Sequence, residues 1–283
     1  MADASSGSSS GKVPVVECAV VAWRFFLENW QRFLPAAVIV ALVSGIAPAL
    51  LVSGQATPLG QLLVAAISTI VGIFFVAAVL RQAVRGEFQG PAGLGFGPDE
   101  TRLFGILGAT ALLVVPPILL FSVVVFVVLL GRMGSADQLD ALAADPEAFN
   151  RALNEALATP AGMVVQLIGL VLIGVLLVVS ARLIMINAAT IGERRIVFFQ
   201  TWSWSKGNVL RIIAAMILTA LPVALFNLIV NSILSGAVGR QGGAAAIMLE
   251  VVIALIGALG LIPQIALGAH LYKGLRPPGF TPK

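Results

Sequence analysis

Four polar side chains stand inside long apolar stretches of the sequence, where a membrane protein could use them to bind a solute or a proton. They are Gln166, Asn227, Asn231 and Glu250. Ionisable groups are costly inside a bilayer and are functional candidates by default. If the four converge, they form an outward-opening polar pocket typical of a small transporter or permease. The alternative is that they form hydrogen bonds between helices, each contributing about 0.6 kcal/mol.

A second group of residues combines basic and aromatic side chains between two apolar stretches. Its members are Arg182, Glu193, Arg194, Arg195, Trp202, Trp204 and Lys206. Indole rings favour the membrane–water interface, and basic groups there attract anionic headgroups with about 1 kcal/mol each. The group therefore predicts a site for lipid headgroups. The alternative is that these charges only orient the chain and that Arg182 forms a local ion pair with Glu193.

Several other chemistries are excluded by the residues present. The chain has one histidine and one cysteine, which can form neither a zinc site nor an intramolecular disulfide. The glycine-rich run 93–97 follows no strand pattern, so it does not predict a dinucleotide loop. No nucleophile elbow or zincin helix is present. We therefore expect no enzymatic activity, no cofactor and no metal.

The composition defines the class of protein to which these residues belong. Of the 283 residues 59% are hydrophobic and only 11% are charged, against about 25% in soluble domains. A span needs about 20 apolar residues. The sequence therefore predicts an all-α, polytopic integral membrane helix bundle with six transmembrane helices. The predicted spans are 33–53, 61–80, 103–130, 161–181, 209–235 and 244–271.

The distribution of charge predicts the direction of the spans. Of the 17 lysines and arginines all but three fall on one side of the six spans; the exceptions are Arg132, Arg151 and Arg240. Basic residues concentrate in cytoplasmic connections, which predicts that both termini are cytoplasmic. The net charge of +4 is explained in this way, and no basic cluster on a polar domain predicts a nucleic-acid partner.

The connections on the basic side share an organisation. Each places amphipathic residues before an outgoing span, which predicts interfacial elbow helices at 13–32, 88–102 and 190–206. In the first elbow Val16, Val20 and Leu27 belong to one helical stripe. Three units of elbow, outgoing span and returning span would make one membrane domain over 13–272. A polar tail at 1–12, predicted to be disordered, and a cytoplasmic tail at 273–283 flank this domain.

The long outer connection at 131–160 is predicted to be amphipathic. Apolar residues recur there at helical spacing, and Asp145-Pro146-Glu147 is typical of a helix start. Its five acids could bind a cation, or they could form a solvated loop face.

Glycines within the spans predict where helices approach each other closely. Gly257 and Gly260 lie in the sixth span, and Gly169 and Gly174 in the fourth. Small residues allow the backbones of membrane helices to come into contact.

The segment 182–211 resembles a motif of a bacterial six-span family. The matching residues are Arg182-Leu183, Ala189, Glu193, Thr201-Trp202, Lys206-Gly207 and Arg211. That family includes the YciC-like inner-membrane proteins and the membrane domain fused to some glycerophosphodiester phosphodiesterases. Ala188 stands where the family has proline, Thr201 replaces a serine, and the stretch from Glu193 to Trp202 is shorter.

The resemblance implies a multi-pass protein of the bacterial inner (cytoplasmic) membrane. It implies no catalysis, because the phosphodiesterase chemistry of the fused proteins resides in a separate soluble domain. We expect a non-enzymatic protein that handles lipids or organises the membrane, as a scaffold or accessory subunit. Its expected partners are membrane lipids, in particular anionic ones, and a further membrane protein. A small transporter that uses the Glu250 pocket is the alternative.

Overall fold

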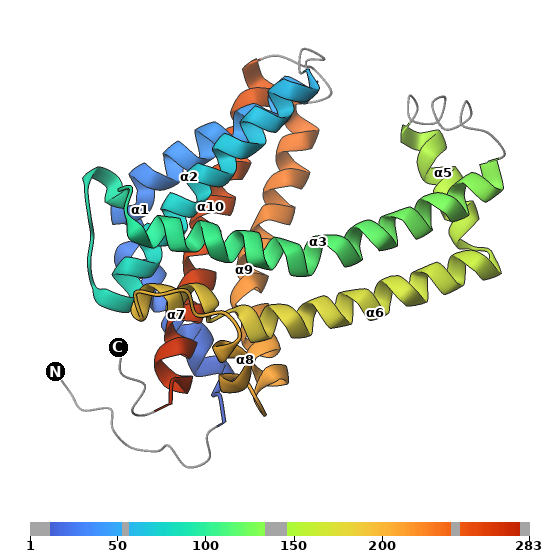
Figure 1. Ribbon diagram of the computed structural model, residues 1–283. Helices are drawn as coiled ribbons and strands as arrows, with labels where there is room; N and C mark the ends of the chain where they lie inside the picture. Colours follow the sequence, from blue (N-terminus) through green and yellow to red (C-terminus); the bar gives the residue numbers. More distant parts are fainter. Residues whose placement is uncertain (1–11, 53–56, 134–145, 239–243, 278–283) are drawn as a thin grey trace. The chain divides into compact units, whose positions relative to one another are not determined.

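The computed structural model describes residues 12–52, 57–133, 146–238 and 244–277, and all regular structure in them is helical (Figure 1). The long helices are α1 (Val15–Val52), α2 (Pro58–Arg85), α3 (Pro98–Met133), α6 (Pro160–Leu183), α9 (Val209–Val238) and α10 (Ala244–Leu275). The short ones are η1 (Pro91–Gly93), α5 (Pro146–Leu157), α7 (Ile186–Gly192) and α8 (Gln200–Trp204).

Six of the described helices are long and apolar enough to cross a membrane. Each predicted span falls within one of them, except that Ser53 lies outside the described residues. The prediction of an all-α polytopic membrane protein is confirmed at this level. Several helices are longer than the predicted spans. For example, α1 has 38 residues, whereas a bilayer core of about 30 Å needs about 20.

Within the membrane domain predicted over 13–272, the chain divides into two compact units. The first comprises residues 1–106 and 181–283, and the second 107–180. In the first unit α10 packs along α1 and also contacts α2 and α9 (Figure 1). Large side chains such as Phe33, Phe75 and Ile262 fill its core.

The second unit contains the adjoining parts of α3 and α6 together with α5. A Cβ atom on Gly169 would lie 2.9 Å from the Phe121 ring, so α3 and α6 approach closely there, as predicted. A Cβ atom on Gly174 would meet nothing within 4 Å. Most of the remaining apolar side chains, for example Leu120 and Leu170, are exposed on this unit.

The first predicted elbow is helical, but it is not a separate helix. Residues 15–32 continue into the first span as α1 without a break. No glycine lies between Lys12 and Gly45, and the helix continues through Pro35 just past the predicted elbow. The stripe that contains Val16, Val20 and Leu27 lies on the surface of the protein, and each of these side chains is exposed.

The other two predicted elbows differ more from expectation. Between 88 and 97 the chain forms only η1, and α3 begins at Pro98, so the elbow at 88–102 is wrong for most of its length. Gly86, Gly90 and Gly93 take positive φ angles, which interrupt helix formation. The elbow at 190–206 consists of the end of α7, a non-helical segment at 193–199, and α8.

The outer connection contains the predicted helix. It is α5, which begins at Pro146 as the sequence indicates, and Glu147 and Glu155 are exposed on it. Asp137, Asp140 and Asp145 lie outside the described residues, as do the first eleven residues of the polar tail and residues 278–283 of the C-terminal tail.

Candidate functional site

The segments predicted to share one side of the membrane meet at one end of the first unit. Arg211 at the start of α9 donates to the Val13 carbonyl oxygen at 3.3 Å, and Asn208 Oδ1 accepts from the Val13 N–H at 3.0 Å. Lys273 Nζ, near the end of α10, donates to the Ala83 carbonyl oxygen at 2.8 Å. These contacts bring the basic connections together. One of these connections contains the candidate lipid site.

We call residues 193–206 the cationic elbow. It joins α7 to α9 and contains α8. Thr190 Oγ1 accepts from the Val197 N–H at 3.2 Å, which fixes the non-helical part against α7. Gly207 follows with φ of 80°, a conformation that favours glycine, and the chain turns there into α9.

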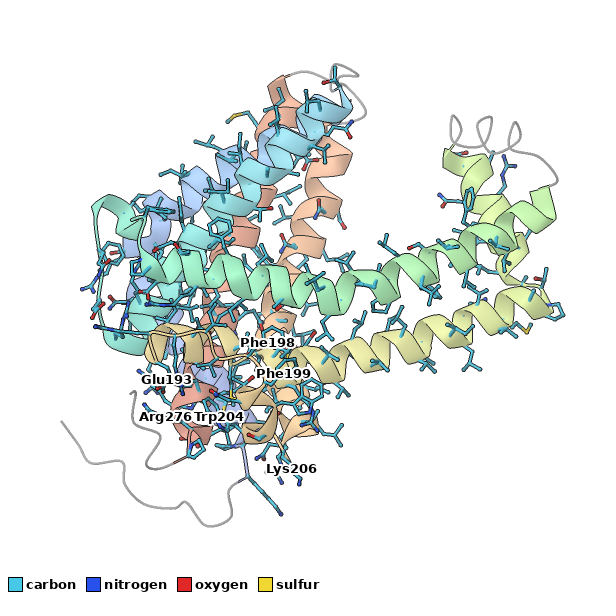
Figure 2. All side chains as sticks on the ribbon, in the orientation of Figure 1. Glu193, Phe198, Phe199, Trp204, Lys206 and Arg276 are labelled. Carbon is cyan, nitrogen blue, oxygen red and sulfur yellow. The ribbon has the colours of Figure 1, made fainter. Side chains whose placement is uncertain are left out.

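The only acid of the cationic elbow is buried. Glu193 is 3% exposed, and its Oε1 accepts from the Tyr272 hydroxyl at 2.5 Å and pairs with Arg276 Nε at 3.2 Å. The Trp204 ring lies beside the Tyr272 ring, with centroids 6.1 Å apart. Figure 2 shows Glu193, Trp204 and Arg276 close together at the end of α10, with Lys206 farther out.

The Glu193–Arg276 pair replaces the local Arg182–Glu193 pair that the sequence offered as an alternative. Arg182 instead donates to the Trp202 carbonyl oxygen at 2.9 Å, and its guanidinium lies 4.9 Å from the centroid of the Trp202 ring. Tyr272 and Arg276 lie far from Glu193 along the chain, and no sequence pattern links them to it. Their roles could be found only from the packing of α10 against α7.

The surface that remains is basic and apolar. Arg194, Arg195 and Lys206 are exposed, whereas Glu193, the one acid of the cationic elbow, is buried. Apolar side chains are exposed among them: Ile196 is 57% exposed, Phe199 76% and Trp202 38%. Cations beside aromatic and aliphatic groups match the chemistry of a membrane surface, where phosphates lie next to acyl chains.

A second charged cluster, which the sequence analysis did not identify, is largely buried. Arg81 pairs with Glu100, and its Nη2 donates to the Gly93 carbonyl oxygen at 3.1 Å. Arg85 pairs with Asp99. Arg81 and Glu100 are almost fully buried. These charges hold the 86–97 segment against α2 and present little surface to a ligand. The only available signal was two arginines four residues apart, followed by two adjacent acids.

Three of the four predicted pocket residues belong to the first unit. Val223 of α9 lies against Gly260 of antiparallel α10. Eight residues later in α9 and eight residues earlier in α10, this register places Asn231 level with residue 252, and hence near the depth of Glu250. Asn231 Nδ2 donates to the Asn227 carbonyl oxygen of its own helix at 3.0 Å.

The surroundings of Glu250 and Gln166 differ. Glu250 is half-buried, and its neighbour Val251 lies against Gly45 of α1. Gln166 belongs to the second unit, where its Nε2 donates to the Leu157 carbonyl oxygen at 2.8 Å. The grouping of Gln166 with the other three stays a prediction. In the part of the chain that the structure describes, no set of three or more His, Cys, Asp or Glu side chains could hold a metal ion.

Comparisons of the chain with family models, with curated proteins and with solved structures give no match.

Proposed function

We propose that this multi-pass membrane protein binds anionic lipids at its cationic elbow and handles or organises them without catalysing a reaction. The exposed surface of residues 193–206 carries this proposal, because it combines Arg194, Arg195 and Lys206 with exposed apolar side chains. The acid of the same segment is buried and neutralised by Arg276. In this proposal the protein lies in a bacterial inner membrane with both termini in the cytoplasm, as a scaffold or accessory subunit.

Two features of the elbow suit a headgroup site. Lysine and arginine can keep their charged ends in water while their stems lie along apolar groups, so the three cations can reach a phosphate layer above Phe199 and Trp202. Arg182 stacks on the Trp202 ring and bonds its backbone, which fixes the ring at the edge of the site. An anchored indole loses little conformational entropy when a lipid binds.

The test is a titration of delipidated protein in detergent with phosphatidylglycerol and, separately, with phosphatidylcholine, read by native mass spectrometry. The variant R194Q/R195Q/K206Q is expected to bind phosphatidylglycerol about 100-fold more weakly, because each cation contributes about 1 kcal/mol. Binding of phosphatidylcholine should not change.

The matched control is R24Q/R32Q/R151Q, which removes the same charge from exposed positions outside the cationic elbow. It should bind phosphatidylglycerol within about threefold of the unmodified protein, because exposed charges that do not contact the bound lipid are screened. Equal weakening by the two triple variants, or equal affinity of the unmodified protein for the two lipids, would contradict the proposal.

A transporter remains the second candidate function, and one observation favours it. Asn227 Oδ1 is buried and has no hydrogen-bond partner among the described residues, although it lies in an apolar helix. Such a group is costly unless a ligand or water satisfies it.

If the protein is a transporter, Glu250→Gln should abolish uptake of the solute into proteoliposomes. The circular dichroism spectrum and the lipid binding of this variant should stay unchanged. Uptake that is equal for the two proteins would remove Glu250 from any transport role.

A further inference from the structure

Arg194 has a backbone conformation that arginine rarely adopts. Its φ is 52°, in the left-handed region. It follows Glu193, the C-terminal cap of α7, and its N–H donates to the Ile191 carbonyl oxygen at 3.4 Å. At this position after a helix glycine is the usual residue, because a Cβ atom is strained there.

Most other described residues with a positive φ are glycines, namely Gly86, Gly90, Gly93 and Gly207. The one described exception besides Arg194 is Ala92, with φ of 61°. Unfavourable backbone conformations that persist at polar surface residues often mark functional sites.

The contacts of the Arg194 side chain do not account for an arginine at this position. The side chain is 69% exposed, and its ion pair with Glu87 has a distance of 3.9 Å between Nη2 and Oε1. The Glu87 side chain is itself 39% exposed and lies 3.2 Å from Arg85 Nε. A long, exposed ion pair with a carboxylate that is already shared contributes little to stability.

The geometry points to Arg194 as a phosphate-binding residue: we propose that it contacts the phosphodiester of an anionic lipid. This inference rests on the proposed function and assigns part of it to one side chain. Arg194 stands where the chain leaves α7, next to Arg195 and the exposed Ile196. A planar guanidinium can bind two phosphate oxygens at once. Because the Arg194 guanidinium is exposed, it gives up few contacts within the protein when it binds a phosphate.

The decisive experiment measures stability and lipid affinity on the same variants. R194G should raise the midpoint of thermal unfolding by about 2 °C, because glycine removes the strain. It should also weaken phosphatidylglycerol binding about fivefold. R194K keeps the charge and the strain, so its midpoint should not change; its affinity should fall less than that of R194G, because lysine keeps the charge without the bidentate geometry.

Two control variants separate strain from charge. A92G relieves the same type of strain, and should raise the midpoint without changing the affinity for phosphatidylglycerol. E87Q frees Arg194 from its ion pair, and should leave this affinity unchanged or increase it. Inorganic phosphate at 100-fold excess over phosphatidylglycerol should not displace the lipid; displacement would assign the site to free phosphate instead.

The inference is overturned if R194G lowers the unfolding midpoint, or if it leaves lipid affinity unchanged while R194Q/R195Q/K206Q weakens it. In that second case the proposed function stands and only the role of Arg194 fails. If the triple variant also binds phosphatidylglycerol normally, the proposed function itself fails.

Discussion

Replacement of Arg81 by methionine is expected to lower the free energy of unfolding by about 3–5 kcal/mol, the largest effect of any substitution considered for this protein. The side chains of Arg81 and Glu100 are 2% and 1% exposed. Removal of the arginine leaves a buried carboxylate without its counter-charge, and the carbonyl oxygen of Gly93 loses its donor. The 86–97 segment would then detach from the end of α2.

This loss can be measured as the unfolding midpoint in mixed micelles with increasing sodium dodecyl sulfate, followed by circular dichroism. Arg102→Gln is the control, because its ion pair with Asp99 is partly exposed and should contribute at most about 1 kcal/mol. The double variant R81M/E100M should recover most of the loss, since no charge remains buried. A single variant as stable as the unmodified protein would show that Glu100 finds another partner or reaches water.

Replacement of Gly260 by alanine is expected to destabilise the first unit by about 2 kcal/mol. A Cβ atom at Gly260 would overlap the side chain of Val223, a branched residue on α9. The two helices would have to separate, or Val223 would have to leave its preferred rotamer. The measurement is again the unfolding midpoint in mixed micelles.

Gly257 provides a control on the same helix. A Cβ atom there would meet nothing within 4 Å, so Gly257→Ala should be neutral or slightly stabilising, because alanine favours helix more than glycine does. Equal effects of the two substitutions would contradict the close approach of α9 and α10 at Gly260.

Both glycines illustrate a limit of sequence reasoning. The pattern predicts that Gly257 and Gly260 in the sixth span both permit close packing. Gly260 lies at a contact and Gly257 does not, although they occupy the same helix one turn apart. Which glycine meets a neighbour depends on the rotation of α10 relative to α9. That rotation is decided by packing, and no local pattern records it.

The sequence by itself determined the structural class of this protein and the order of its long helices along the chain. Long apolar segments with few charges must bond their backbones internally, which is why six long helices follow from composition alone. The helix start at Pro146 was also predictable, because proline and acids favour a first turn. The basic and aromatic residues of 193–206 could likewise be identified as a candidate site from their types and spacing.

Only the tertiary structure decided which charges remain available to a ligand. Glu193 forms an ion pair with Arg276 and accepts a hydrogen bond from Tyr272, and Arg81 forms an ion pair with Glu100, across separations that no helical period connects. It also decided that the segment 15–32 continues into α1, and that Arg194 takes a left-handed backbone. Burial and pairing depend on contacts between distant helices, so a sequence can show that a charge exists but only packing shows whether it is still exposed.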